Sequence, residues 1–153
     1  MDTTGEMRIP ASRDKVWAAL NNPGMLRRCI PGCQSLDKAG PNEMDATVKV
    51  KVAFISTTFR GKVRLSNLNP HESLTITGEG SGGFAGTARG IADISLREDG
   101  DETIATYTLR AETSGKLALL GSRMIQSSLN KLAVQFFEKL AKKLSRRAEA
   151  TET

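Results

Sequence analysis

The side chains best suited to acid–base chemistry in this sequence are three carboxylates and one arginine. Glu79, Asp93, Glu112 and Arg89 belong to segments that alternate in polarity like strands. Inside a cavity, such carboxylates would transfer protons and the guanidinium would orient an anionic group. On the outer face of a strand, the same residue types form solvated ion pairs. The single histidine, His71, lies in a turn-like segment, so a Ser-His-Asp or Cys-His arrangement has no convincing base and we expect no catalytic residues.

Two cysteines could hold a metal or change redox state. Cys29 and Cys33 flank an Ile-Pro-Gly segment, and this spacing is neither the redox Cys-x-x-Cys nor a zinc knuckle. Two thiols alone make a poor zinc site, so we expect no metal. The sequence favours two partly buried thiols beside a Pro31-Gly32 turn, with a regulatory disulfide as the alternative.

A glycine-rich stretch over residues 78–83 matches the pattern G-x-G-x-x-G. A dinucleotide site requires this motif to open a helix, whereas residues 88–96 alternate like a strand, and no Gly-Lys-Ser/Thr follows. Nucleotide binding is therefore disfavoured. The glycines could bend a curved sheet, keep its concave face open for a ligand, or form a flexible hairpin tip.

Positive charge is concentrated near the C-terminus. The chain has 22 Lys and Arg residues, and without the five in residues 139–147 the other 17 balance 17 Asp and Glu. These five are Lys139, Lys142, Lys143, Arg146 and Arg147. Such a patch suits an anionic membrane or a protein partner, or it is a solvated helix end that complements the helix dipole. Nucleic acid is not an expected partner, because the patch is short and few aromatic residues are available for stacking.

The predicted elements begin with a strand over residues 3–9 and two short helices. Ser12 is a candidate N-cap for the first helix, which carries Trp17, and the second ends near Cys29. Period-two alternation then predicts strands over residues 44–54, 59–65, 73–80, 88–96 and 103–111. The connections are too short for crossover helices, so the sheet should be antiparallel.

A single long helix is predicted over residues 115–147. Its apolar stripe would cover one face of the sheet; it comprises Ile125, Leu129, Leu132, Ala133, Phe136, Leu140 and Leu144. Leu117, Leu120 and Met124 lie on the opposite side of this helix. A neighbouring loop would bury them, or they would form an exposed apolar lip near a cavity mouth.

The chain is predicted to be a single α+β domain over residues 1–147, followed by a frayed tail over residues 148–153. Its 153 residues are enough to bury a core without metals or disulfides. No window approaches the ~18–20 apolar residues of a membrane span, and no secretory signal pattern is present. We therefore expect a cytoplasmic protein whose membrane contact is peripheral.

Four stretches together resemble a known family. The opening Gly-Glu-Met-Arg-Ile-Pro-Ala-Ser with Val16-Trp17 is similar to the start of the START/Bet v 1-like (SRPBCC) helix-grip superfamily. The Cys-Ile-Pro-Gly-Cys turn, residues 78–90, and Gly-Lys-Leu with Leu-Gly-Ser-Arg in residues 115–123 narrow the resemblance to CoxG, the G subunit of carbon monoxide dehydrogenase. The resemblance covers almost the whole chain.

This resemblance implies a helix-grip fold, in which about six to seven curved antiparallel strands wrap around the C-terminal helix in β-α-α-β(n)-α order. It also implies a cavity for a quinone- or lipid-like molecule, with no tightly bound cofactor. The expected partners are a molybdenum hydroxylase of the carbon monoxide dehydrogenase type and the inner face of the cytoplasmic membrane. The alternatives are an enzyme like the polyketide cyclases or hydratases, and an assembly factor for the molybdenum enzyme.

On this hypothesis apolar residues of the sheet and the long helix line the cavity. The expected lining residues are Trp17, Phe54, Phe59, Phe84, Tyr107, Leu117, Leu120, Met124, Ile125, Leu129, Leu132 and Phe136. The five basic residues of the helix end would contact the membrane or the partner enzyme.

Overall fold

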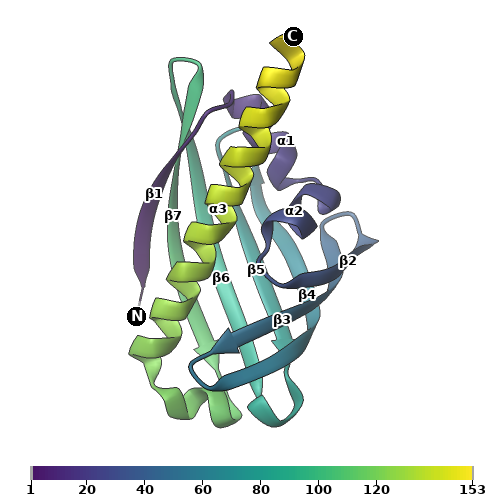
Figure 1. Cartoon of the computed structure of the whole chain (residues 1–153), viewed down its shortest axis with the longest axis vertical. Helices are drawn as coiled ribbons and strands as arrows, with labels where there is room; N and C mark the ends of the chain where they lie inside the picture. The colour runs from purple at the N-terminus through teal and green to yellow at the C-terminus, as the bar shows by residue number, and fades with distance from the viewer. Residues whose placement is uncertain (1, 153) are drawn as a thin grey trace.

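A single curved antiparallel sheet forms the framework of the molecule. The computed structural model describes residues 2–152, and the side chains of residues 2–145. Within these residues seven strands pair in the order β1-β7-β6-β5-β4-β3-β2. Their bounds are β1 Thr3–Ile9, β2 Cys33–Gly40, β3 Glu43–Val52, β4 Ile55–Asn69, β5 Ser73–Ser81, β6 Thr87–Asp99 and β7 Glu102–Thr113. The α+β helix-grip prediction is confirmed, because the sheet curves around one long helix (Figure 1).

Two short helices connect the first two strands, as predicted. Helix α1 spans Arg13–Leu20, and its N-cap Ser12 accepts a hydrogen bond from the Lys15 amide at 3.4 Å. Helix α2 spans Pro23–Cys29, with Asn22 as its N-cap and proline in its first turn. A side-chain cap satisfies an otherwise unpaired backbone N–H, which is why these residues begin helices here.

The C-terminal helix starts later than the sequence predicts. Residues Gly115–Leu120 form a separate 3-10 segment, η2, and α3 spans Ser122–Glu152. The break lies at Gly121, whose φ of 89° is incompatible with a continuous α-helix. The prediction of one continuous helix from residue 115 is therefore wrong for residues 115–121. An apolar segment such as Gly115–Leu120 can form a 3-10 helix as well as an α-helix.

Helix α3 packs along the concave face of the sheet and joins the core at its C-terminal half. Phe137 and Leu140 are fully buried there, and the Phe137 ring stacks on Tyr107 of β7 with ring centroids 4.8 Å apart. Near the start of α3, the buried Gln126 amide donates hydrogen bonds to the Leu109 carbonyl (2.8 Å) and to Thr3 Oγ1 (2.9 Å). These two bonds fix the helix against β7 and β1, because an unpaired buried amide would be costly.

Two strand predictions require correction. Strand β2 was not predicted, because Gln34, Asp37 and Lys38 are polar and the segment lacks an apolar alternation. The alternation over residues 44–54 stops at Val52, because Ala53 adopts φ 54° and begins a tight turn to β4. Phe54 therefore lies at a hairpin tip rather than on the concave face.

Candidate ligand-binding cavity

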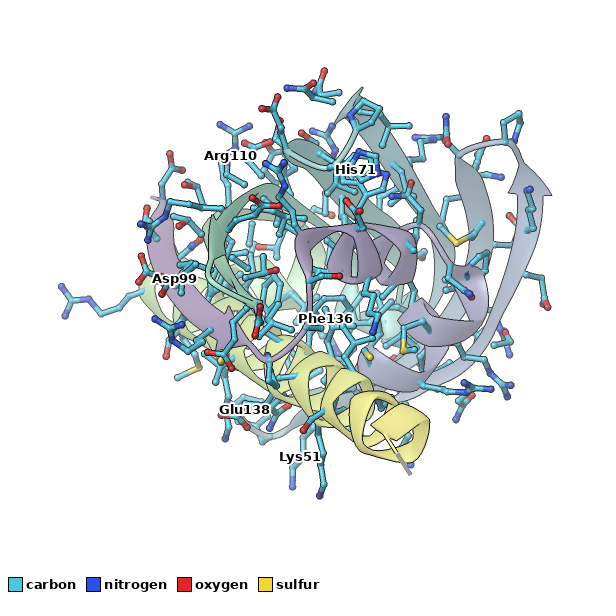
Figure 2. All side chains as sticks on the ribbon, turned by 90° about the horizontal axis from the view of Figure 1, so that it is seen from above. Lys51, His71, Asp99, Arg110, Phe136 and Glu138 are labelled. Carbon is cyan, nitrogen blue, oxygen red and sulfur yellow. The ribbon has the colours of Figure 1, made fainter. Side chains whose placement is uncertain are left out.

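A cavity of about 330 Å³ lies between the concave face of the sheet and α3. Side chains of α3 form one wall, among them Ile125, Leu129, Leu132, Ala133 and Phe136. Phe136 projects from α3 toward the sheet, whereas Glu138 points away from it (Figure 2). The volume falls within the range of pockets that hold small molecules.

Small residues on the sheet keep this space open. The inward positions of the central strands carry Ala46, Gly61, Gly78, Gly80, Ala88, Gly90, Ala92 and Ala111, and all of them line the cavity. A Cβ added at Gly78 would meet no atom within 4 Å, whereas one at Gly90 would lie 3.4 Å from Leu129 Cδ1. Larger residues such as Leu74 and Leu96 occupy the same face farther along, where the core is filled. The cavity therefore exists because many inward positions in one half of the concave face carry glycine or alanine instead of a large side chain.

Gly61 permits a close approach between the backbones of β4 and β5 beside the cavity. A Cβ at this position would overlap the carbonyl oxygen of Glu79 on the neighbouring strand. Only glycine permits such a close backbone approach. Within the glycine-rich stretch of residues 78–83, Gly78 on β5 contributes open space to the cavity. The stretch is followed by the short 3-10 segment η1 (Gly83–Ala85) and then by strand β6. It therefore does not open an α-helix, as a dinucleotide site requires.

The four residues considered for acid–base chemistry lie on the strand face opposite to the cavity, although Glu79 and Arg89 also border it. Arg89 pairs in register with Glu79 on one side and Glu112 on the other, so all three share the convex face, opposite to Gly90. Arg89 and Glu112 form an ion pair at 3.5 Å, and Glu79 accepts from Arg64 at 2.7 Å. Asp93 accepts a hydrogen bond from Thr75 Oγ1 at 2.6 Å on the same outer face. These contacts match the ion-pair interpretation for Glu79, Arg89 and Glu112, whereas Asp93 accepts a hydrogen bond instead.

Six of the twelve residues expected to line the cavity do so. These are Phe59, Leu117, Ile125, Leu129, Leu132 and Phe136. Leu117 is buried although it belongs to η2, because that segment folds back under the cavity. The alternation of β4 and the period of α3 place the other five, and both patterns were visible in the sequence.

The other six expected lining residues lie elsewhere. Trp17 packs at the far end of the molecule, with its ring 6.0 Å from that of His71, and Tyr107 belongs to the filled core. Phe54 and Phe84 are exposed at loop tips. Leu120 and Met124 do not line the cavity, because the break at Gly121 places them outside it. The choice of the four aromatic residues among these six was wrong, because the open space comes from small side chains on the sheet.

The cysteines are free thiols in the structure. Burial raises the pKa of Cys29, and nearby Lys143, Lys139 and Arg28 partly offset that shift. Burial also raises the pKa of Cys33, whose thiol donates to the Ser35 carbonyl at 3.4 Å. Both thiols therefore favour the protonated, less reactive form.

The basic end of α3 packs next to α2 rather than at the cavity's loop end. Lys139 and Lys142 are exposed and Lys143 is half-buried. The side chains of Arg146 and Arg147 lie outside the described residues. No helix in the described part of the chain is long and apolar enough to span a bilayer. Among the side chains of residues 2–145, no group of three or more His, Cys, Asp or Glu residues could hold a metal ion.

Comparisons with known proteins identify the family. The family model for CoxG, the G subunit of carbon monoxide dehydrogenase, matches residues 5–145. The chain belongs to the CoxG family. A comparison with curated proteins finds no match.

Solved structures similar to this CoxG-family chain share its fold. A conserved protein from Geobacillus kaustophilus is 26% identical, with a TM-score of 0.87 over 95% of this chain and 96% of that one. The Zhui aromatase/cyclase from Streptomyces sp. R1128 is 14% identical, with a TM-score of 0.66 over 97% and 95%. Truncated norcoclaurine synthase from Thalictrum flavum is 16% identical, with a TM-score of 0.60 over 92% of each chain. The last two comparisons show the fold alone.

Proposed function

We propose that this chain holds a quinone- or lipid-like molecule in its cavity and recruits a molybdenum hydroxylase of the carbon monoxide dehydrogenase type to the inner face of the cytoplasmic membrane. In this role the chain links the enzyme to the quinone pool and catalyses no reaction itself. One observation carries the proposal: a CoxG-family chain contains a cavity lined almost throughout by aliphatic and aromatic side chains.

The cavity favours an uncharged, largely apolar ligand. Burying a charge without a partner is costly, and the charged side chains at its border, such as Glu79 and Arg89, are paired with other residues. Phe59 and Phe136 offer aromatic surface to a planar ring. The hydroxyl of Thr113 at the border can donate to a quinone carbonyl. A volume of about 330 Å³ suits the ring and the first part of a prenyl tail rather than a complete long tail.

The basic end of α3 supplies a charged surface for assembly. Lys139 and Lys142 project into solvent, so they are free to meet an acidic surface on the partner enzyme. Such contacts set the association rate and weaken with salt. This expectation extends to Lys143, Arg146 and Arg147 as members of the same patch.

Recruitment is tested with the purified molybdenum hydroxylase of the same cell and anionic vesicles that contain quinone. We expect the enzyme to sediment with the vesicles only when this protein is added, and to reduce the membrane quinone faster in its presence. Enzyme that remains in the supernatant would contradict recruitment. If enzyme prepared from cells lacking this protein is also missing its molybdenum cofactor, the assembly-factor alternative replaces the proposal.

A further inference from the structure

Four large apolar side chains are exposed together at one end of the molecule. The exposed fractions are 85% for Phe54, 93% for Phe84, 84% for Leu119 and 44% for Met124. Among the described side chains only one other large apolar residue is comparably exposed, Leu68 at 37%. Scattered exposed apolar residues are ordinary, but a group confined to one end marks a contact surface.

These residues come from three connections that lie at the same end of the sheet. Strands β3, β5 and β7 run in the same direction, so the turn after β3, the η1 connection after β5 and the η2 segment after β7 are neighbours. Thr57 Oγ1 donates to the Gly82 carbonyl at 2.9 Å, and the Ser114 amide donates to the Thr87 carbonyl at 3.0 Å. These bonds join the three connections into one rim, which we call the loop rim (residues 50–57, 81–88 and 113–124).

The loop rim carries only positive charge. Its charged residues are Lys51, Lys116 and Arg123, and it contains no Asp or Glu. All three are exposed, and Lys116 Nζ lies 6.0 Å from the centroid of the Phe84 ring. In an anionic membrane, acyl chains lie beneath acidic headgroups. The apolar side chains of the loop rim could contact the acyl chains while the neighbouring cations contact the headgroups.

The cavity reaches this rim. Val52, Thr113 and Leu117 belong to the loop rim and also line the cavity. A ligand that leaves the bilayer at the rim would therefore pass from one apolar environment to another without crossing water. This continuity favours a membrane over a protein as the occupant of the surface.

We propose that the loop rim is the membrane-contacting surface, with Phe54, Phe84 and Leu119 inserted below the headgroups of an anionic bilayer. This assignment rests on the proposed function and deepens it, because it names the surface that faces the membrane. The basic end of α3 lies at the opposite end of the molecule (Figure 1). Lys139 is roughly 25 Å along the helix from its start at Ser122, well beyond the reach of screened surface charges. In the docked orientation that end faces away from the membrane.

The test uses the full chain and vesicles of phosphatidylglycerol and phosphatidylcholine that contain no quinone, so it is independent of ligand binding and of the partner enzyme. Phe54→Ser, Phe84→Ser and Leu119→Ser are each expected to lower the vesicle partition coefficient about tenfold, since each removes a membrane-buried side chain. Leu68→Ser makes the same kind of change at the opposite end of β4 and should leave partitioning unchanged. The variant Lys139→Glu/Lys142→Glu should likewise retain binding.

Depth of insertion gives a second readout. Phe84→Trp should be quenched by vesicles whose acyl chains are brominated, whereas Leu68→Trp and the native Trp17 should not. A triple variant combines Phe54→Ser, Phe84→Ser and Leu119→Ser. Wild-type partitioning in this triple variant, or loss of binding in Lys139→Glu/Lys142→Glu alone, would overturn the assignment. A wild-type dimer in solution that becomes monomeric in the triple variant, with no vesicle binding by either, would assign the rim to a second copy of this chain instead.

Discussion

Replacing Gly78 with leucine is expected to weaken ligand binding strongly while leaving the fold intact. Gly78 lies on the inward face of β5, and a Cβ added there meets no atom within 4 Å. Its φ is not in the left-handed region, so a larger residue is not strained at this position. The leucine side chain would occupy the space where the ligand ring lies. The affinity for a short-tailed quinone, measured by titration, should fall about tenfold or more.

Thr77→Leu is the matched control for this substitution. Thr77 is the neighbour of Gly78 in β5, points to the opposite face and does not line the cavity. This variant should bind the quinone as the wild type does. Equal quinone affinities in wild type, Gly78→Leu and Thr77→Leu would show that the ligand does not occupy the cavity. A large loss of stability in Gly78→Leu would contradict the open space seen beside it.

Phe137→Ala is expected to cost about 3–5 kcal/mol of unfolding free energy, which is the range for truncating a buried aromatic residue. Phe137 is 2% exposed and stacks on Tyr107 at 4.8 Å. This pair joins α3 to β7, so its loss removes both apolar burial and the main aromatic contact across the layer. Urea unfolding followed by circular dichroism measures the change.

The adjacent Phe136 provides the comparison for this measurement. Both residues line the cavity between α3 and the sheet, but Phe136 is only partly buried whereas Phe137 is fully buried. Phe136→Ala should therefore destabilise the protein less than Phe137→Ala. A loss of less than about 1 kcal/mol for Phe137→Ala would contradict the packing of α3 onto β7.

The sequence predicts the elements well where local physics alone determines them. Ser12 caps α1 as expected, because its side-chain oxygen accepts a hydrogen bond from the Lys15 amide in the first turn of the helix. The alternation of β4 and the 3.6-residue period of α3 place Phe59, Leu129 and Phe136 correctly on the cavity wall. The caps, turns and alternation along the chain predict two short helices after the first strand, then a run of strands and one long helix, and the family resemblance adds the helix-grip fold. The observed elements and the family match confirm both.

The errors arise where one backbone angle changes the outcome for several residues. A positive φ at Ala53 places Phe54 at a tip, and one at Gly121 separates η2 from α3. Apolar composition does not distinguish an exposed tip from a buried wall, so Phe54 and Phe84 were placed in the cavity. Such exposure depends on the three-dimensional neighbours of each residue, which alternation along a strand does not record.

The size of the cavity could not be predicted from the alternation of residues along the strands. The alternation of apolar and polar residues over residues 88–96 predicts a strand, and its inward positions include Ala88, Gly90 and Ala92. Whether such small residues face a bulky partner or an empty space depends on what α3 places opposite them. Here α3 places Leu129 opposite Gly90, 3.4 Å from the point that a Cβ would occupy there, and leaves the space beside Gly78 unfilled.

The central claim is that the cavity holds an apolar molecule taken from the membrane. The most direct test is mass spectrometry of organic extracts from wild-type protein and the Gly78→Leu variant, each purified from a cell that makes isoprenoid quinones. We expect a quinone or lipid at a near-stoichiometric amount in the wild type, and its loss in the variant. Extracts without any such molecule, or with equal amounts from both proteins, would contradict the claim.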